Sequence, residues 1–233
     1  MMPASPDTIL CQPDVKKGCS ACCGLFNHRR LDRRFLAGFL ERNTEEQTSC
    51  FQISDAVADA FPGPVRDQAS YICPFQGFVF PGRPGCLIHP GLRGEDLRDR
   101  SFFGKKICDG FLCPAYSVLT EAEKKDLICL VDDWYLYTVA VIDPESFSWI
   151  MRNARDLCAG NDKADSFRPL VLSALNMHAR CLDEYPGPVF FYALPEYNLA
   201  KGGYTLTADD ERAAAERESI IKTMARLVEK AGR

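Results

Sequence analysis

The residues with the clearest chemistry in this sequence are seven cysteines in the first half of the chain. Three of them lie within five residues, in a short loop between Gly18 and Gly24. Thiolates are soft ligands that suit zinc and iron–sulfur clusters, and a glycine-flanked loop is a poor place for buried filler. We therefore expect most of this set to ligate a metal centre: Cys19, Cys22, Cys23, Cys73, Cys86, Cys108 and Cys113.

The spacing within this set also favours metal binding. Cys19 and Cys22 are separated by two residues, so a tight turn can point both sulfurs the same way. Proline follows Cys73 and Cys113, as it follows a ligand cysteine in bacterial ferredoxin motifs. One zinc ion or one cluster takes four thiolates. The set therefore includes spectators, ligands of a second metal or a redox pair, and the adjacent Cys22 and Cys23 are expected to point apart.

Five further cysteines bring the total to 12. Free cysteine is among the most buried residue types, so we interpret these five as core residues, with the first two more ambiguous than the others: Cys11, Cys50, Cys129, Cys158 and Cys181.

Histidines and basic residues are weaker candidates. His89 follows Cys86 by three residues and is an alternative ligand, although a lone histidine more often only forms hydrogen bonds. His28 and His178 are expected to be structural or surface groups. Segment 16–34 is rich in Lys and Arg. We interpret it as a solvated surface; alternatively, its charges offset those of the thiolates or hold an anionic ligand.

Composition narrows the class of protein. The 233 residues suffice for one large domain or two small ones, and the net charge of −4 indicates no nucleic-acid or membrane partner. Residues 1–15 lack the pattern of a signal peptide, and no apolar run is long enough to span a bilayer. We therefore expect a cytoplasmic protein, in which clustered cysteines bind metal or do redox chemistry rather than form disulfides.

The elements that must position the cysteines are mostly helices. Periodicity and capping signals predict a mainly α fold with a small β-hairpin, in which a loop-rich cysteine cluster packs on a helical bundle. Residues 1–117 form the cysteine-cluster metal-binding region and residues 118–233 the helical region, unless the two are one continuous domain. The hairpin joins strands 78–80 and 86–88 through a loop at 81–85. The other predicted elements are an irregular arm at 1–18, a loop or short helix at 91–107, a strand at 189–194, and helices at 29–42, 53–61, 120–141, from 143 onward, 165–184 and after a cap at 207.

Four motifs together resemble a known family. Cys-x2-Cys-Cys, Cys-Pro-Phe, Gly-Cys-Leu-Ile-His-Pro and a late cysteine near a phenylalanine are similar to those of the CxxCxxCC-type cysteine-cluster proteins, which are described as zinc- or iron-chelating. The resemblance covers residues 16–115. The family pattern begins one cysteine earlier, where this chain has Lys16, with Cys11 the nearest substitute, and the interval from Cys86 to Cys108 is longer here. A related group, the flagellin lysine methylases, implies an iron–sulfur cluster by resemblance.

Three functions fit these observations. We favour a protein that holds an iron–sulfur cluster, most simply of the 4Fe–4S type, or iron, in a redox or group-transfer role. The alternative is a structural zinc site whose helical half is an interaction module. The third is a thiol redox or metal-trafficking protein in which Cys22 and Cys23 exchange partners. No nucleotide-binding loop, zinc-protease motif or nucleophile triad is present, so the sequence predicts no catalytic residue and no substrate.

Overall fold

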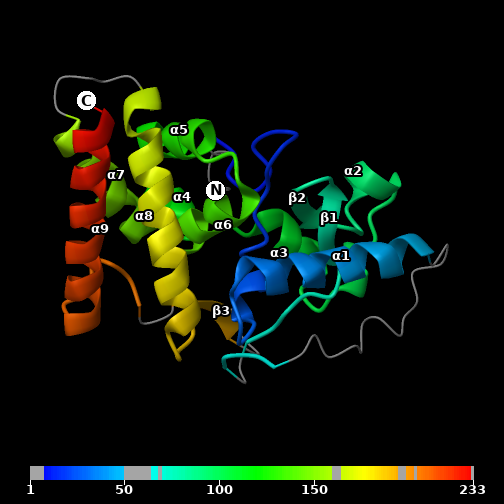
Figure 1. Ribbon diagram of the computed structural model, residues 1–233. Coiled ribbons are helices and arrows are strands. Elements are labelled where there is room, and N and C mark those ends of the chain that lie inside the picture. The colour runs from blue at the N-terminus through cyan, green and yellow to red at the C-terminus, as the bar shows by residue number, and fades with distance from the viewer. Residues whose placement is uncertain are drawn as a thin grey trace.

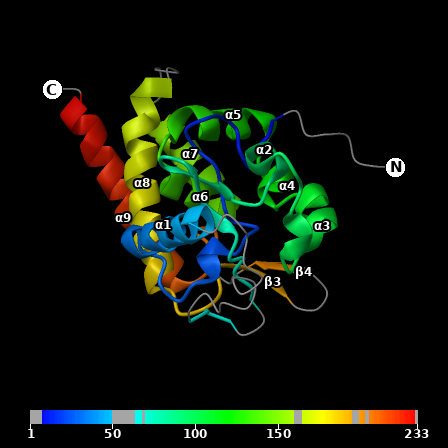
Figure 2. The same cartoon turned by 90° about the vertical axis from the view of Figure 1, so that its right-hand side faces the viewer.

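The computed structural model describes residues 8–49, 64–67, 70–158, 164–193, 198–201 and 204–231. It confirms a mainly helical fold with a small antiparallel hairpin, and adds a second hairpin near the C-terminal end (Figures 1 and 2). In chain order the elements are η1 (Leu25–Asn27), α1 (Arg33–Ser49), β1 (Gln76–Phe80), β2 (Arg83–Cys86), α2 (Pro90–Arg93), η3 (Arg98–Arg100), α3 (Gly104–Gly110), α4 (Ala115–Val118), α5 (Glu121–Leu130), α6 (Trp134–Ile142), α7 (Pro144–Leu157), α8 (Ala164–Glu184), β3 (Phe190–Ala193), β4 (Asn198–Lys201) and α9 (Glu211–Ala231).

The first hairpin is confirmed, but its loop is shorter than predicted. β1 pairs with β2 in antiparallel register, and Phe80 already pairs with Arg83. Only Pro81 and Gly82 are left for the turn, and Gly82 has a φ of 71°. Proline followed by a residue with positive φ is a favoured tight turn, so the second strand begins at Arg83 and ends at Cys86 rather than running to residue 88.

The long helix predicted over 120–141 is wrong, because it is two helices. Thr120 and Glu123 form the predicted capping box at the start of α5. α5 then ends, and the Asp133 side chain accepts a 2.9 Å hydrogen bond from the Leu136 N–H to begin α6. All nine residues of α6 are buried, which confirms that this apolar segment is central.

The helices on the C-terminal side begin and end close to prediction, with one exception. Asp143 and Pro144 start α7 as predicted, and the Asp143 side chain caps it. α9 begins at Glu211 and is capped by Asp210 rather than by Thr207, because the Asp210 carboxylate accepts the Ala213 N–H at 2.7 Å. α8 and α9 lie side by side at one end of the molecule, and β1 and β2 lie towards the other (Figure 1).

The remaining predicted elements are partly tested. α1 begins four residues later than the predicted helix, because the Asp32 carboxylate accepts the Phe35 N–H at 3.0 Å, and it ends seven residues later, at Ser49. The predicted strand near 190 is β3, which pairs with the unpredicted β4. The helix predicted at 53–61 lies outside the described residues. Among the helices that are described, none is both long and apolar enough to cross a bilayer.

Two hydrophobic clusters hold the chain together. The main cluster includes Leu10, Leu25 and Leu36 from the first half and Tyr137 and Leu175 from the second. A smaller cluster joins three buried residues beneath the first hairpin, Cys73, Phe75 and Ile88. The cysteines are positioned where these two clusters meet.

Candidate metal centre

The seven predicted cysteines come together in the structure, although they belong to distant segments. The thiol of Cys22 interacts electrostatically with each of the other six, Cys19, Cys23, Cys73, Cys86, Cys108 and Cys113. Cys22 is therefore the common neighbour of thiols from the Gly18–Gly24 loop, the first hairpin, α3 and the start of α4.

Main-chain hydrogen bonds tie these segments to each other. The Cys73 N–H donates to the Cys23 carbonyl at 2.8 Å. The Gln76 side chain then donates from Nε2 to the carbonyls of Cys23 and Cys73, at 3.1 and 3.0 Å. Gln76 also pairs with Cys86 across the hairpin, so one buried side chain joins three of the cysteine positions.

Backbone N–H groups are directed at three of the sulfurs. In each case the donor lies two residues after the cysteine: Phe75 to Cys73, Ile88 to Cys86, and Ala115 to Cys113. Hydrogen bonds to a thiolate favour its charged form. In the two Cys-Pro dipeptides, at Cys73 and Cys113, the proline has no N–H to donate. The residue after the proline donates its N–H to the sulfur instead.

Without a bound metal, burial opposes ionisation of the same thiols. It raises the pKa of Cys86 to about 11 and that of Cys113 to about 12, against the lowering by the backbone donors. Burial also raises the pKa of Cys73 and of the more exposed Cys108. Thiols of this kind stay protonated until a positive charge such as a metal ion compensates the buried anion.

Arg98 is the cation next to the thiols, and the sequence analysis missed it. Its charge favours the thiolate forms of Cys86 and Cys108. The guanidinium is held by Asp96 at 2.8 Å and Asp109 at 2.5 Å. Segment 91–107 mixes both signs of charge, so nothing in the sequence distinguished this arginine from its neighbours.

Cys11 also belongs to the cluster, contrary to its interpretation as a core residue. Its thiol is hydrogen-bonded to that of Cys19, and the Cys19 N–H donates to the Cys11 carbonyl at 2.9 Å. The Tyr116 hydroxyl lies 3.6 Å from the Cys11 sulfur. The Cys19 hydrogen bond lowers the pKa of Cys11 to about 6, against burial, with a further lowering by Tyr116.

Two glycines allow the loop around Cys19 and Cys22 to fit. Gly24 has a φ of 79°, and a Cβ at this position would lie 2.0 Å from the Tyr71 carbonyl oxygen. A Cβ at Gly18 would lie 2.6 Å from the Pro84 carbonyl oxygen. Backbone atoms cannot yield as a flexible side chain can, so both positions require glycine.

The chemistry of the candidate ligands fits a thiophilic metal, because all of them are thiols. In the same loop Ser20 is fully buried, and its hydroxyl has no hydrogen-bond partner among the described residues. As the side chains stand in the described ranges, no three His, Cys, Asp or Glu residues form a group that could hold a metal ion.

The other cysteines lie away from the seven. Cys129 is exposed, so its prediction as a core residue is wrong: it lies on the solvent side of α5. Cys158 and Cys181 are partly buried and pack against the main hydrophobic cluster. Cys50 lies outside the described residues.

The histidines and the basic segment have structural contacts. His89 is exposed and its Nδ1 accepts the Gly91 N–H at 3.1 Å, capping α2. His28 is fully buried against the rings of Phe35 and Phe39. In the basic segment Lys17 is buried, which differs from the predicted solvated surface; its Nζ lies 2.6 Å from the Ile128 carbonyl and 2.8 Å from Asp132.

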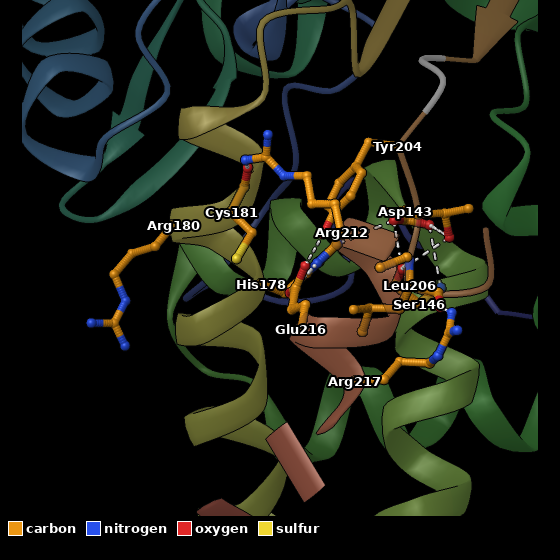
Figure 3. A network of polar contacts seen from close by, with 12 residues as sticks. Asp143, Ser146, His178, Arg180, Cys181, Tyr204, Leu206, Arg212, Glu216 and Arg217 are labelled. Atoms are coloured by element: carbon orange, nitrogen blue, oxygen red, sulfur yellow. Dashed lines mark hydrogen bonds and ion pairs between the residues drawn. The ribbon is translucent and has the colours of Figure 1, made fainter. Parts of the chain in front are cut away.

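A second polar cluster, also missed from the sequence, lies between α7, α8 and α9 (Figure 3). His178 is 1% exposed and lies between two carboxylates, 2.9 Å from Glu216 and 3.1 Å from Asp143. Tyr204 donates to Glu216, and Ser146 donates to Asp143 at 2.6 Å. Leu175 and Leu182 lie three residues before and four residues after His178 and are buried, a helical spacing that could have placed this histidine on the core face.

The pKa of His178 reflects this position. Burial lowers it, but the hydrogen bonds and charges of Asp143 and Glu216 prevail and raise it to about 9. The imidazole is therefore a cation at neutral pH, shared by carboxylates from two other elements. This arrangement joins the three helices.

Comparison with known proteins identifies no relative: no family model matches the chain, and neither curated proteins nor solved structures include a significant match. The function must therefore be argued from the site itself.

Proposed function

We propose that this chain is a metal-binding protein that holds an iron–sulfur cluster through its clustered cysteines, in a redox or group-transfer role. The observation that carries the proposal is that Cys22 interacts with six other thiols that come from distant segments of the chain. A donor set made only of thiols suits iron–sulfur clusters and zinc far better than hard cations.

The surroundings of the sulfurs support a cluster in particular. When bound, a 4Fe–4S cluster supplies one-electron chemistry at a potential tuned by hydrogen bonds to sulfur and by burial. The N–H groups of Phe75, Ile88 and Ala115 stabilise negative charge on the sulfurs they contact. Arg98 adds a positive charge beside Cys86.

A structural zinc site is the second candidate, with an observation of its own. The cysteines lie at the junction of the two hydrophobic clusters, since Cys19 and Cys113 belong to the main one and Cys73 to the smaller one. Zinc bound there would link the first hairpin to the helical half of the chain and would contribute to the free energy of folding.

The compartment and the family belong to the same proposal. Every cysteine in the described part of the chain is a free thiol, which supports a reducing compartment such as the cytoplasm. The resemblance to the cysteine-cluster proteins stays part of the proposal, because the residues that carry it include the clustered thiols.

Elemental analysis and absorbance spectroscopy of protein purified without oxygen test the proposal. Iron with matching sulfide and absorbance near about 400 nm supports a cluster, whereas zinc without visible absorbance supports a structural zinc site. Cys73→Ser should lower metal content, and Cys158→Ser, which changes a cysteine outside the cluster, should not. Protein without iron or zinc, or equal metal content in both variants, would overturn the proposal.

A further inference from the structure

We infer that the cysteines form two adjacent metal centres of four thiols each, and that Cys11 completes one of them. This inference rests on the proposed function and specifies its site. The first centre comprises Cys11, Cys19, Cys22 and Cys113. The second comprises Cys23, Cys73, Cys86 and Cys108.

The first group is connected by contacts that do not involve the hairpin. Cys11 and Cys19 share a hydrogen bond between their thiols and another between their main chains. The Tyr116 hydroxyl lies 3.6 Å from the Cys11 sulfur, and the Tyr116 N–H donates to the Cys113 carbonyl at 3.0 Å. Cys113 in turn interacts electrostatically with both Cys11 and Cys22. Three segments thus supply the four cysteines of this set. As the side chains stand in the described ranges, they do not yet form a group that could hold a metal ion, so metal binding would draw the four sulfurs together.

The second group is built around the first hairpin. Cys23 is fastened to Cys73 by the 2.8 Å main-chain bond, and Gln76 joins both to the strand that carries Cys86. Cys108, from α3, interacts electrostatically with Cys73 and Cys86.

The hydrophobic clusters divide six of the eight thiols in the same way, and this observation does not depend on the charges; Cys11 and Cys108 belong to neither cluster. Cys19, Cys22 and Cys113 contact the main cluster, whereas Cys23, Cys73 and Cys86 contact the smaller one. The division falls between the adjacent Cys22 and Cys23. Contrary to the expectation that these two side chains point apart, their thiols are hydrogen-bonded to each other, so the two centres would be near neighbours.

The donor count agrees with this division. One zinc ion or one cubane cluster takes four thiolates, so seven thiols leave three without a role, whereas the eight including Cys11 supply two complete sets. A single cysteine run that supplies ligands to two centres has a parallel in two-cluster ferredoxins, where the fourth cysteine of one run ligates the other cluster. Both centres would take thiophilic metal, as iron–sulfur clusters or as zinc.

Titration of the reduced, metal-free full-length protein with cobalt(II) counts the centres. Thiolate-to-cobalt charge-transfer absorbance should rise until two equivalents are bound, because each four-thiol set takes one ion. Cys11→Ser and Cys108→Ser, one from each set, should each weaken binding of one of the two cobalt ions and leave the other at wild-type affinity, because a site with three thiolates and a water holds its metal less tightly. The double variant should weaken both. Cys158→Ser is the matched control and should behave as wild type.

The outcomes separate this inference from the proposed function. Saturation of the wild type at one equivalent overturns the two-centre division but leaves a metal-binding protein. Loss of all cobalt binding in either single variant, or unweakened binding in folded Cys11→Ser, overturns the division as well. A wild type that binds no cobalt overturns both. Circular dichroism confirms that each variant retains its helices, and iron and sulfide analysis distinguishes two clusters, about eight irons, from two zinc ions.

Discussion

Replacing His178 with glutamine should make the protein less stable at neutral pH and change how its stability depends on pH. The imidazolium joins carboxylates from two elements, Asp143 before α7 and Glu216 on α9. Without it, two buried carboxylates face each other with no cation between them. Breaking a buried ion pair by removing one partner typically costs about 3–5 kcal/mol, so we expect a loss in this range near pH 6.

The pH dependence follows from the raised pKa of His178. A histidine whose folded pKa lies above its unfolded value stabilises the protein fully below the unfolded pKa, and this stability is lost as pH rises through the folded pKa. Here the values are 6.5 and about 9. At about 1.36 kcal/mol per pKa unit the contribution is about 3 kcal/mol, lost between about pH 6.5 and pH 9. The difference between wild type and His178→Gln should therefore shrink by about this amount.

Urea denaturation of both proteins in reductant, at pH values from about 6 to 10, measures this difference. Cys181 is the cysteine tied to this network, through a hydrogen bond to Glu216, and burial, reinforced by Glu216, raises its pKa to about 12, above the range of the experiment. His89→Gln, a change of an exposed histidine that caps α2, is the matched control: its stability should lie below the wild type by a nearly constant amount across this pH range. A constant difference between wild type and His178→Gln across this pH range would refute the claim that His178 is a buried cation.

Three further predictions concern other positions. Gly24→Ala should lower the free energy of unfolding by more than about 2 kcal/mol and reduce metal content, because a Cβ would meet the Tyr71 carbonyl as well as strain a positive φ. Gly82→Ala, with a positive φ but open space, should cost only about 1–2 kcal/mol; equal losses would contradict the steric argument. Lys17→Met should cost about 1–3 kcal/mol in thermal or urea unfolding, since it removes charged hydrogen bonds, and the exposed Lys16→Met should cost little. His28→Phe should reduce acid sensitivity, because burial lowers the pKa of His28 to about 4 and about 3 kcal/mol is lost as pH falls from 6.5 through 4; an unchanged acid transition would contradict this.

The elements that could be predicted from the sequence are those specified by nearby residues. The capping box of Thr120 and Glu123, the Asp143-Pro144 start of α7 and the Pro81-Gly82 turn act over a few residues. Their signals can be read without knowing what packs against them. The seven cysteines were likewise identifiable by type, spacing and flanking glycines.

Where the predicted helices and strands differ from those observed, contacts between residues far apart in the sequence are the reason. The helix predicted over 120–141 divides where the Lys17 ammonium, 111 residues from its partner, takes the Ile128 carbonyl. Similarly, β4 was not predicted because its pairing with β3 depends on the tertiary structure.

The sequence by itself determined the chemistry of the candidate site, since residue types and short spacings specify which ligands are present. The tertiary structure alone decided which thiols are neighbours, how Cys11 joins them and that Arg98 lies beside them. It also placed His178 between carboxylates from two other elements. The physical reason is that hydrogen bonds and charge interactions depend on distances in space, and only packing of the two hydrophobic clusters sets those distances between segments far apart in the chain.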